Sequence, residues 1–165
     1  MKQLSNRADC VFTGKGLSFG GSLMRPEATG YGTVYFAQEV LKHAGRSLDG
    51  MRVSVSGSGN VAQFAVEKAM SQGAKVVTVS DSSGTIVDEA GFTPEKLAIL
   101  AEVKNHLYAR LDEYARRTNV TFLPGAKPWH VPVQVALPCA TQNELTGEDA
   151  RALINNGVIC VAEGA

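Results

Sequence analysis

The sequence has few cysteines and no excess of either charge, and each shortage excludes a class of protein. Its three cysteines, Cys10, Cys139 and Cys160, are far apart and form no Cys-x-x-Cys pair. Neither a disulfide framework nor a zinc site is therefore expected, and no metal ligands are predicted. Basic and acidic residues number 16 each. The chain thus has no net field to attract nucleic acid or a membrane surface, and neither is an expected partner.

Long apolar runs are also missing. No stretch approaches the roughly 18 consecutive apolar residues of a membrane helix, and the N-terminus lacks the apolar core of a signal peptide. Hydrophobic residues still make up 44% of the 165 residues. That is enough for one globular domain with its own core. Because nothing indicates disulfides or export, we expect a protein of the reducing cytoplasm.

Histidine is scarce as well, which limits the catalysis that this chain can perform. His43, His106 and His130 are isolated in the sequence, and no serine–acid or cysteine set accompanies them. We expect all three at the surface and predict no catalytic residue in this chain.

Helical patterns alternate with short β-branched segments from residue 26 onward. Residues 1–25 are rich in glycine and serine without clear periodicity, and we interpret them as an irregular lead-in. The patterns predict helices over about 26–45, 61–73, 94–104, 111–117 and 147–156, and strands over 51–56, 75–79, 133–137 and 158–162. This alternation indicates an α/β fold, namely a Rossmann-like open, mostly parallel sheet with helices on both faces.

The segment 51–81 has the pattern of a dinucleotide site. A predicted strand leads into Gly57-Ser58-Gly59-Asn60-Val61-Ala62, which fits Gly-x-Gly-x-x-Gly/Ala, and a helix and a second strand follow. Gly57 permits a tight exit from the strand, Gly59 lets the backbone approach a pyrophosphate, and Ala62 keeps the helix close to the sheet. The phosphates would lie against free N–H groups at the start of the helix.

An acidic residue ends the second strand, as a dinucleotide site requires. Asp81 follows Gly59 by 22 residues, close to the roughly 20 expected of the carboxylate that binds a ribose hydroxyl. Dinucleotide binding is the prediction. The alternatives are a glycine turn without a ligand and an S-adenosylmethionine site.

The choice between NAD and NADP stays open at the level of single residues. Asp81 favours NAD, because a carboxylate repels a 2′-phosphate. Ser82 can donate a hydrogen bond there, and Lys104 and Arg110 would offset the carboxylate if they folded back over the ribose. From the residues alone, these two cations fit a solvated helix end equally well.

Five runs of the sequence occur together, and in this order, in one known family. They are residues 13–22, 25–32, 53–62, 80–84 and 137–144, which read TGKGLSFGGS, RPEATGYG, VSVSGSGNVA, SDSSG and LPCATQNE. Through them nearly the whole chain resembles hexameric glutamate dehydrogenases of the bacterial NADP-linked type. Such enzymes interconvert L-glutamate with 2-oxoglutarate and ammonia.

The resemblance implies NADP as the cofactor, with NAD as the alternative, and it assigns roles to particular positions. Thr29 matches a threonine on the nicotinamide side, and Asp81 and Ser82 match the adenosine-ribose site. Lys104 and Arg110 resemble the cations that NADP-linked members place near the 2′-phosphate. The remaining matches are the pyrophosphate loop at Gly57, Ser58, Gly59, Asn60 and Val61, and the loop beside the nicotinamide ring at Ala140, Thr141 and Asn143.

The resemblance also indicates what this chain lacks. The family's substrate-binding lysines and its proton-transferring aspartate belong to an N-terminal domain, and a closing helical segment follows the last strand. Neither is expected here. We therefore interpret residues 26–165 as the dinucleotide-binding domain of a fragment, inactive alone, which meets glutamate or 2-oxoglutarate only with the missing domain.

Two further expectations concern how such a chain works and assembles. The alternative function is a stand-alone nucleotide-binding or sensing module without catalysis, and a relic without a ligand is a third interpretation. The full-length family forms hexamers largely through the absent domain. We accordingly expect a monomer or weak dimer for this chain.

Overall fold

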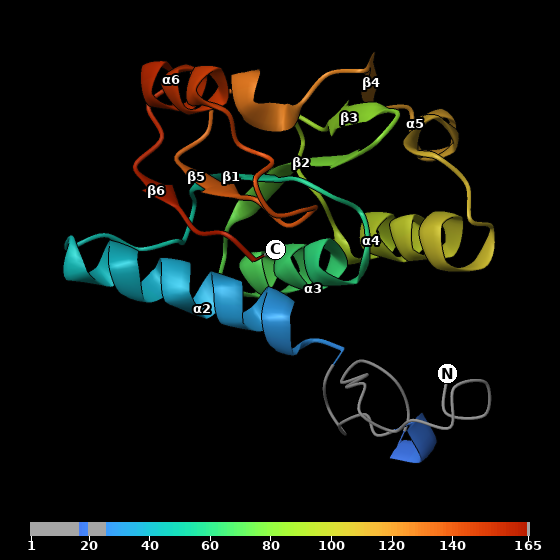
Figure 1. The fold of residues 1–165 in the computed structure, drawn as a ribbon, viewed down its shortest axis with the longest axis horizontal. Helices are drawn as coiled ribbons and strands as arrows, with labels where there is room; N and C mark the ends of the chain where they lie inside the picture. Colours follow the sequence, from blue (N-terminus) through green and yellow to red (C-terminus); the bar gives the residue numbers. More distant parts are fainter. Residues whose placement is uncertain (1–16, 20–25, 165) are drawn as a thin grey trace, which may run out of the picture.

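The computed structural model describes residues 17–19 and 26–164, and in these residues helices cover both faces of a six-stranded sheet (Figure 1). Most of the predicted lead-in over 1–25 lies outside the described residues. Its described part, η1 (Leu17–Phe19), is a single 3₁₀ turn. Among the described helices, none is long and apolar enough to cross a membrane.

The sheet is mixed and has the strand order β4-β3-β2-β1-β5-β6. Strand β1 pairs in parallel with β2 on one side and with β5 on the other, and β6 extends the parallel part. Strands β3 and β4 are antiparallel and form the opposite edge. The bounds are β1 Arg52–Val55, β2 Lys75–Asp81, β3 Gly84–Val87, β4 Thr121–Pro124, β5 Val135–Leu137 and β6 Cys160–Val161.

The antiparallel edge departs from the sequence-based expectation, which included neither β3 nor β4. After β2 the chain reverses directly into β3, with Asp81 opposite Gly84. In β4, three of the four residues are exposed. An exposed edge strand shows little hydrophobic alternation, so its sequence pattern is weak.

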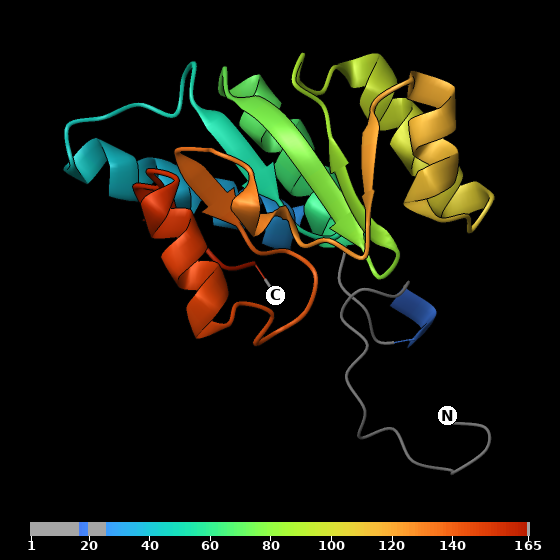
Figure 2. The same cartoon turned by 90° about the horizontal axis from the view of Figure 1, so that it is seen from above.

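The helices form two layers, as predicted. Figure 1 shows α2, α3 and α4 below the sheet and α6 above it, and Figure 2 shows α5 beside the edge that β3 and β4 form. This arrangement confirms the α/β class with helices on both faces. The helix bounds are α2 Ala28–His43, α3 Asn60–Ser71, α4 Pro94–Ala101, α5 Leu111–Thr118 and α6 Gly147–Asn155, with a π-helical turn η2 at Glu102–His106 and a 3₁₀ turn η3 at Pro128–His130.

Helices α4 and α6 begin at threonine caps. Thr93 accepts a hydrogen bond from the Lys96 N–H, and Pro94 occupies the first turn of α4. Thr146 forms a reciprocal capping box with Asp149. The far end of α4 differs from expectation, because the helix widens into η2 at Glu102 instead of continuing unchanged to Lys104.

The core lies between the sheet and the layer of α2, α3 and α4. Valines of β1 and β2 are fully buried, and they meet a row of small residues, Ala62, Ala65 and Ala69, on α3. These alanines bring α3 close to the strands, as predicted for Ala62. Because β1, β2 and β5 are parallel, the loops that follow them meet at one edge of the sheet, where ligands bind in open α/β folds.

Candidate functional site

The glycine turn after β1 begins with a residue in the left-handed region. Gly57 has a φ of +82°, and a Cβ on it would approach the Cys139 carbonyl oxygen to 2.8 Å. Both facts require glycine. The loop after β5 therefore passes directly against this turn. Two hydrogen bonds then join Gly57 to Ser80 of β2: the Gly57 N–H donates to Ser80 Oγ at 3.0 Å, and the Ser80 N–H donates to the Gly57 carbonyl at 3.1 Å.

Gly59 is the N-cap residue of helix α3, and no side chain caps the first N–H groups of the helix. A Cβ on Gly59 would meet no atom within 4 Å, so the glycine faces open space. A hollow of about 290 Å³ lies at this point, lined by Gly57, Ser58, Gly59, Asn60, Val61, Ser80, Asp81, Cys139 and Ala140. The free N–H groups and the positive end of the helix dipole suit an anion.

Asp81 ends β2 at the rim of the hollow and has three hydrogen-bond donors. Its Oδ1 accepts from the Ser83 N–H at 2.8 Å and from Ser83 Oγ at 2.5 Å, and its Oδ2 accepts from Lys104 Nζ at 3.0 Å. Burial alone raises the pKa of Asp81, but the hydrogen bonds from Ser83 and Lys104 outweigh it and hold the pKa below its usual value. The carboxylate is thus ionised and paired.

Two cations reach this rim from segments that follow α4. Lys104 lies in η2, and its ammonium donates to Asp81 and to the Ala109 carbonyl, each at 3.0 Å. Arg110, just before α5, donates from Nη1 to Ser82 Oγ at 2.6 Å. The interpretation as a solvated helix end is therefore wrong for Lys104, whereas Arg110 bonds to the same turn but remains exposed.

The loop after β5 is held by a carboxylate that the sequence analysis did not single out. Glu144 Oε1 accepts from Ser56 Oγ at 2.7 Å and from the Ala140 N–H at 3.1 Å. Ser56 Oγ in turn accepts from the Cys139 N–H at 2.9 Å. This network joins the start of the loop to the end of β1, while Thr141 and Asn143 in its middle are exposed. Asn143 has a φ of +59°, which bends the loop back.

Thr29 lies in the first turn of α2, close to the start of α3. A Cβ on the neighbouring Gly30 would meet the Val61 carbonyl at 2.6 Å, and Asn60 Nδ2 donates to the Pro26 carbonyl at 2.5 Å. The structure thus brings α2 against the glycine-turn side of α3. Of the predicted site residues, the structure brings Gly57 to Val61, Asp81 and Ala140 together around the hollow. Lys104 and Arg110 bond to Asp81 and Ser82 at its rim, whereas Thr29, Thr141 and Asn143 are not among the residues that line it.

Other titratable residues do not form a catalytic set in the described part of the chain. Burial, with a smaller contribution from Glu144, raises the pKa of Cys139 to about 12, so this cysteine stays a thiol. Cys139 and Cys160 are both free and buried. His43, His106 and His130 are exposed, as predicted.

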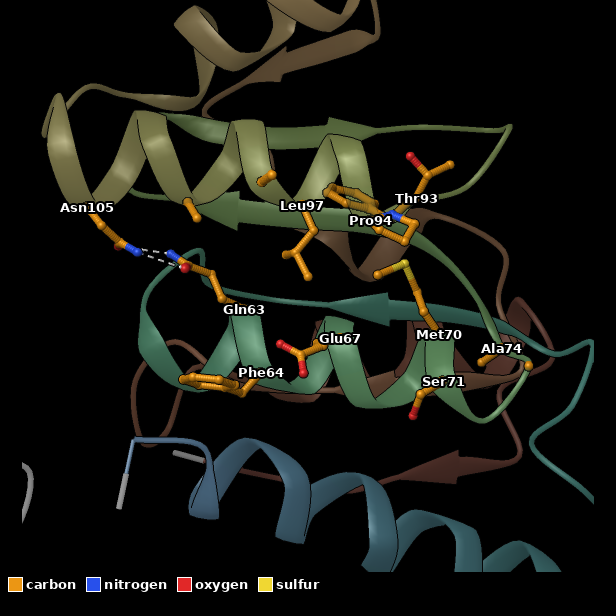
Figure 3. Close-up of a pocket in the computed structure, with 14 residues that line it drawn as sticks. Gln63, Phe64, Glu67, Met70, Ser71, Ala74, Thr93, Pro94, Leu97 and Asn105 are labelled. Carbon is orange, nitrogen blue, oxygen red and sulfur yellow. Dashed lines mark hydrogen bonds between the residues drawn. The ribbon is translucent and has the colours of Figure 1, made fainter. Parts of the chain in front are cut away.

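A larger groove of about 890 Å³ separates α3 from α4 and contains none of the predicted site residues (Figure 3). Its walls include Phe64, Met70 and Leu97, and Glu67 contributes a carboxylate. A phosphate is bound best where positive charge is available, and the groove walls contain no lysine, arginine or histidine among the described residues. We therefore place the candidate site in the smaller hollow.

Sequence reasoning missed four neighbours of the site, namely Ser56, Gln63, Ser80 and Glu144. Ser56 comes directly after β1 and Ser80 lies in β2. A single serine at such a position has no distinctive sequence pattern. Glu144 stands inside the run LPCATQNE, so the motif itself was the available signal. Its partner Ser56, however, is 88 residues away.

Comparison with known proteins gives the same family as these motifs. A sequence profile of the glutamate/leucine/phenylalanine/valine dehydrogenase family matches residues 20–165. The NADP-specific glutamate dehydrogenases of Salmonella typhimurium and Escherichia coli are 66% and 64% identical over 165 residues. These matches cover 100% of this chain and 37% of each relative. This chain therefore spans a little over a third of the relatives' length.

A solved structure shares the fold. The crystal structure of Plasmodium falciparum glutamate dehydrogenase superposes with a TM-score of 0.87 at 43% identity, covering 99% of this chain and 35% of that one. The family profile matches most of the chain, and the sequence identities are higher than a shared fold alone requires. The chain belongs to the glutamate/leucine/phenylalanine/valine dehydrogenase family.

Proposed function

We propose that residues 26–165 form the dinucleotide-binding domain of an NADP-linked glutamate dehydrogenase, and that the hollow beside the glycine turn binds NADP(H). The observation that carries this proposal is the pair of cations at the end of β2. Lys104 bonds to Asp81, and Arg110 bonds to Ser82, so both meet the strand end that conventionally holds the adenosine ribose.

The pyrophosphate would lie against the start of α3. The residues present fit that group, because Gly59 faces open space and the first N–H groups of α3 lack side-chain caps. Ser58 to Val61 would hold the phosphates, and Ala140, Thr141 and Asn143 would border the nicotinamide with Thr29. When bound, the nicotinamide ring supplies the centre that accepts or donates a hydride.

The charges at the ribose end support NADP over NAD. Asp81 pairs with Lys104, and Arg110 bonds to the neighbouring Ser82, so these three charged side chains together carry one positive charge. An ammonium has three N–H donors, and Lys104 uses two of them on Asp81 and Ala109. Its third donor and the remaining donors of the Arg110 guanidinium are suited to a 2′-phosphate.

The names of the relatives support the same cofactor. Two are called NADP-specific, and a Xylanibacter ruminicola relative at 52% identity is called an NAD(P)-specific glutamate dehydrogenase. For the whole protein we propose the oxidative deamination of L-glutamate to 2-oxoglutarate and ammonia, and the reverse reaction. Because this chain spans 37% of those relatives, its own proposed part is to hold the cofactor.

The test is a calorimetric titration of this chain with NADPH and with NADH, repeated for Lys104→Ala. Charge-assisted hydrogen bonds contribute about 1.5–3 kcal/mol, so NADPH affinity should fall by roughly ten- to a hundredfold while NADH affinity changes little. Lys96→Ala is the matched control. Like Lys104, Lys96 forms a salt bridge with an aspartate, but it lies on α4 and its partner is Asp88, away from the hollow. Failure of the folded, unaltered chain to bind either dinucleotide would refute the proposal.

A further inference from the structure

A pair of side-chain amides links α3 to the π-helical turn that carries Lys104. Gln63 Nε2 donates to Asn105 Oδ1 at 3.1 Å, and Asn105 Nδ2 donates back to Gln63 Oε1 at 3.0 Å. Figure 3 shows both bonds closing one end of the groove between α3 and α4. Gln63 Nε2 also donates to the Ser58 carbonyl of the glycine turn at 2.8 Å. We call Gln63 and Asn105 the amide clasp.

The turn η2 directs two adjacent side chains to different partners. The Leu107 N–H bonds to the Glu102 carbonyl at 3.0 Å, five residues earlier, which is the wide spacing of a π-helix. Such turns are found mostly as single insertions in α-helices and often at functional sites. Lys104 extends from this turn to Asp81, and Asn105 extends to Gln63.

We propose that the amide clasp is a positioning device for the 2′-phosphate of NADP(H), acting through Lys104. A lysine side chain has a flexible four-carbon stem, so the place of its ammonium depends on where its backbone is held. The clasp holds that backbone by bonding the next residue to α3. Asn105 uses both ends of its amide on Gln63, whereas Lys104 bonds to Asp81, which makes Asn105 a positioning residue rather than a ligand. This inference rests on the proposed function.

The two halves of the clasp should have different effects on binding. Within the described part of the chain, the Asn105 side chain bonds only to Gln63, so Asn105→Ala should loosen η2 and spare the glycine turn. Gln63 additionally holds the Ser58 carbonyl. Gln63→Ala should therefore weaken both NADPH and NADH, because both share the pyrophosphate, whereas Asn105→Ala should weaken NADPH alone.

The experiment is the same calorimetric titration, with NADPH and NADH as probes. For Asn105→Ala we expect a loss of about three- to tenfold in NADPH affinity, the range for one or two neutral hydrogen bonds, and no change for NADH. Exchanging the two amides in Gln63→Asn/Asn105→Gln keeps their combined length and should restore part of the preference. Gln38→Ala is the matched control, because Gln38 and Gln72 form an amide pair between α2 and α3 away from the hollow.

A double-mutant cycle tests whether the clasp acts through Lys104. In the Lys104→Ala background, Asn105→Ala should have no further effect on NADPH affinity, whereas independent effects would add. Additive losses, or an NADPH-to-NADH ratio that survives Asn105→Ala in a folded chain, would overturn the clasp and leave the proposed function standing. An unaltered chain that binds neither dinucleotide would overturn both.

Discussion

Asp81 carries a charge that would oppose a 2′-phosphate, and its neighbours determine the effect of that charge. Ser83 bonds to its Oδ1 and Lys104 bonds to its Oδ2, and the Asp81 side chain is 8% exposed. A carboxylate in this setting orients the cation beside it. Asp81 can therefore belong to an NADP site, although by its position alone it would favour NAD.

The ion pair of Asp81 should make stability depend on pH in the acid range. Because its pKa is lower in the folded chain than in the unfolded chain, it contributes stability above the unfolded pKa, about 3.9, and loses that contribution as pH falls through the folded pKa. In chemical denaturation, the unaltered chain should be more stable than Asp81→Asn at neutral pH. The difference should shrink below about pH 4.

Other carboxylates with lowered pKa values, such as Asp149, titrate in both proteins and cancel in this comparison. A difference in unfolding free energy that stayed constant from neutral pH to pH values well below 4 would show that the Asp81 charge does not stabilise the fold.

At the scale of secondary-structure elements, the crossing of α2 and α3 depends on one glycine. Gly30 is buried, and a Cβ there would lie 2.6 Å from the Val61 carbonyl and 2.8 Å from the Ala65 nitrogen. Backbone atoms cannot move aside as a flexible side chain can. The helices are therefore as close as a residue without a side chain allows, and this contact aligns α2 with the start of α3.

Gly30→Ala should destabilise the chain by about 1–3 kcal/mol, the usual cost of overpacking. Gly32 lies one half-turn away on the same helix, and a Cβ there would meet nothing within 4 Å. Gly32→Ala should instead stabilise α2 by about 0.5–1 kcal/mol, because alanine favours the helix. Urea denaturation of both variants measures the difference, and equal effects would contradict this account of the crossing.

Local sequence patterns predicted most of these elements and missed those that depend on pairing. The strand, glycine turn, helix and strand from residue 51 to Asp81 follow from periodicity and glycine placement. Strands β3 and β4 did not: β4 is an exposed edge strand, and the short strand β3 is recognised by its pairing with β2 and β4. The widening of α4 into η2 has no composition signal either.

At the scale of the whole molecule, the acidic side chains and the thiol next to the proposed cofactor site are already engaged or protonated in the described residues. Near the hollow, Asp81 is bound to Lys104, and burial keeps Cys139 protonated. Proton transfer from a positioned group contributes typically 10²–10⁴-fold to an enzymatic rate. The chain by itself should therefore bind the cofactor without acting on glutamate.

Mixing this chain with glutamate and NADP should produce no NADPH above a control without protein, as followed by NADPH absorbance. The NADP-specific glutamate dehydrogenase of Escherichia coli serves as the positive control under the same conditions. Glutamate-dependent NADPH formation by this chain would contradict the prediction. The monomer or weak dimer expected for this chain also stays a prediction, and sedimentation of a hexamer would contradict it.

The sequence by itself determined the α/β class, the order of the central elements, and the glycine turn with Asp81 at the end of the next strand. These depend on neighbours within about thirty residues, whose periodicity and turn chemistry are written locally. Only the tertiary structure decided that Lys104 bonds to Asp81, that Arg110 bonds to Ser82, and that Glu144 holds Ser56 across 88 residues. Such contacts join segments whose relative placement comes from packing, on which periodicity along the chain carries no information.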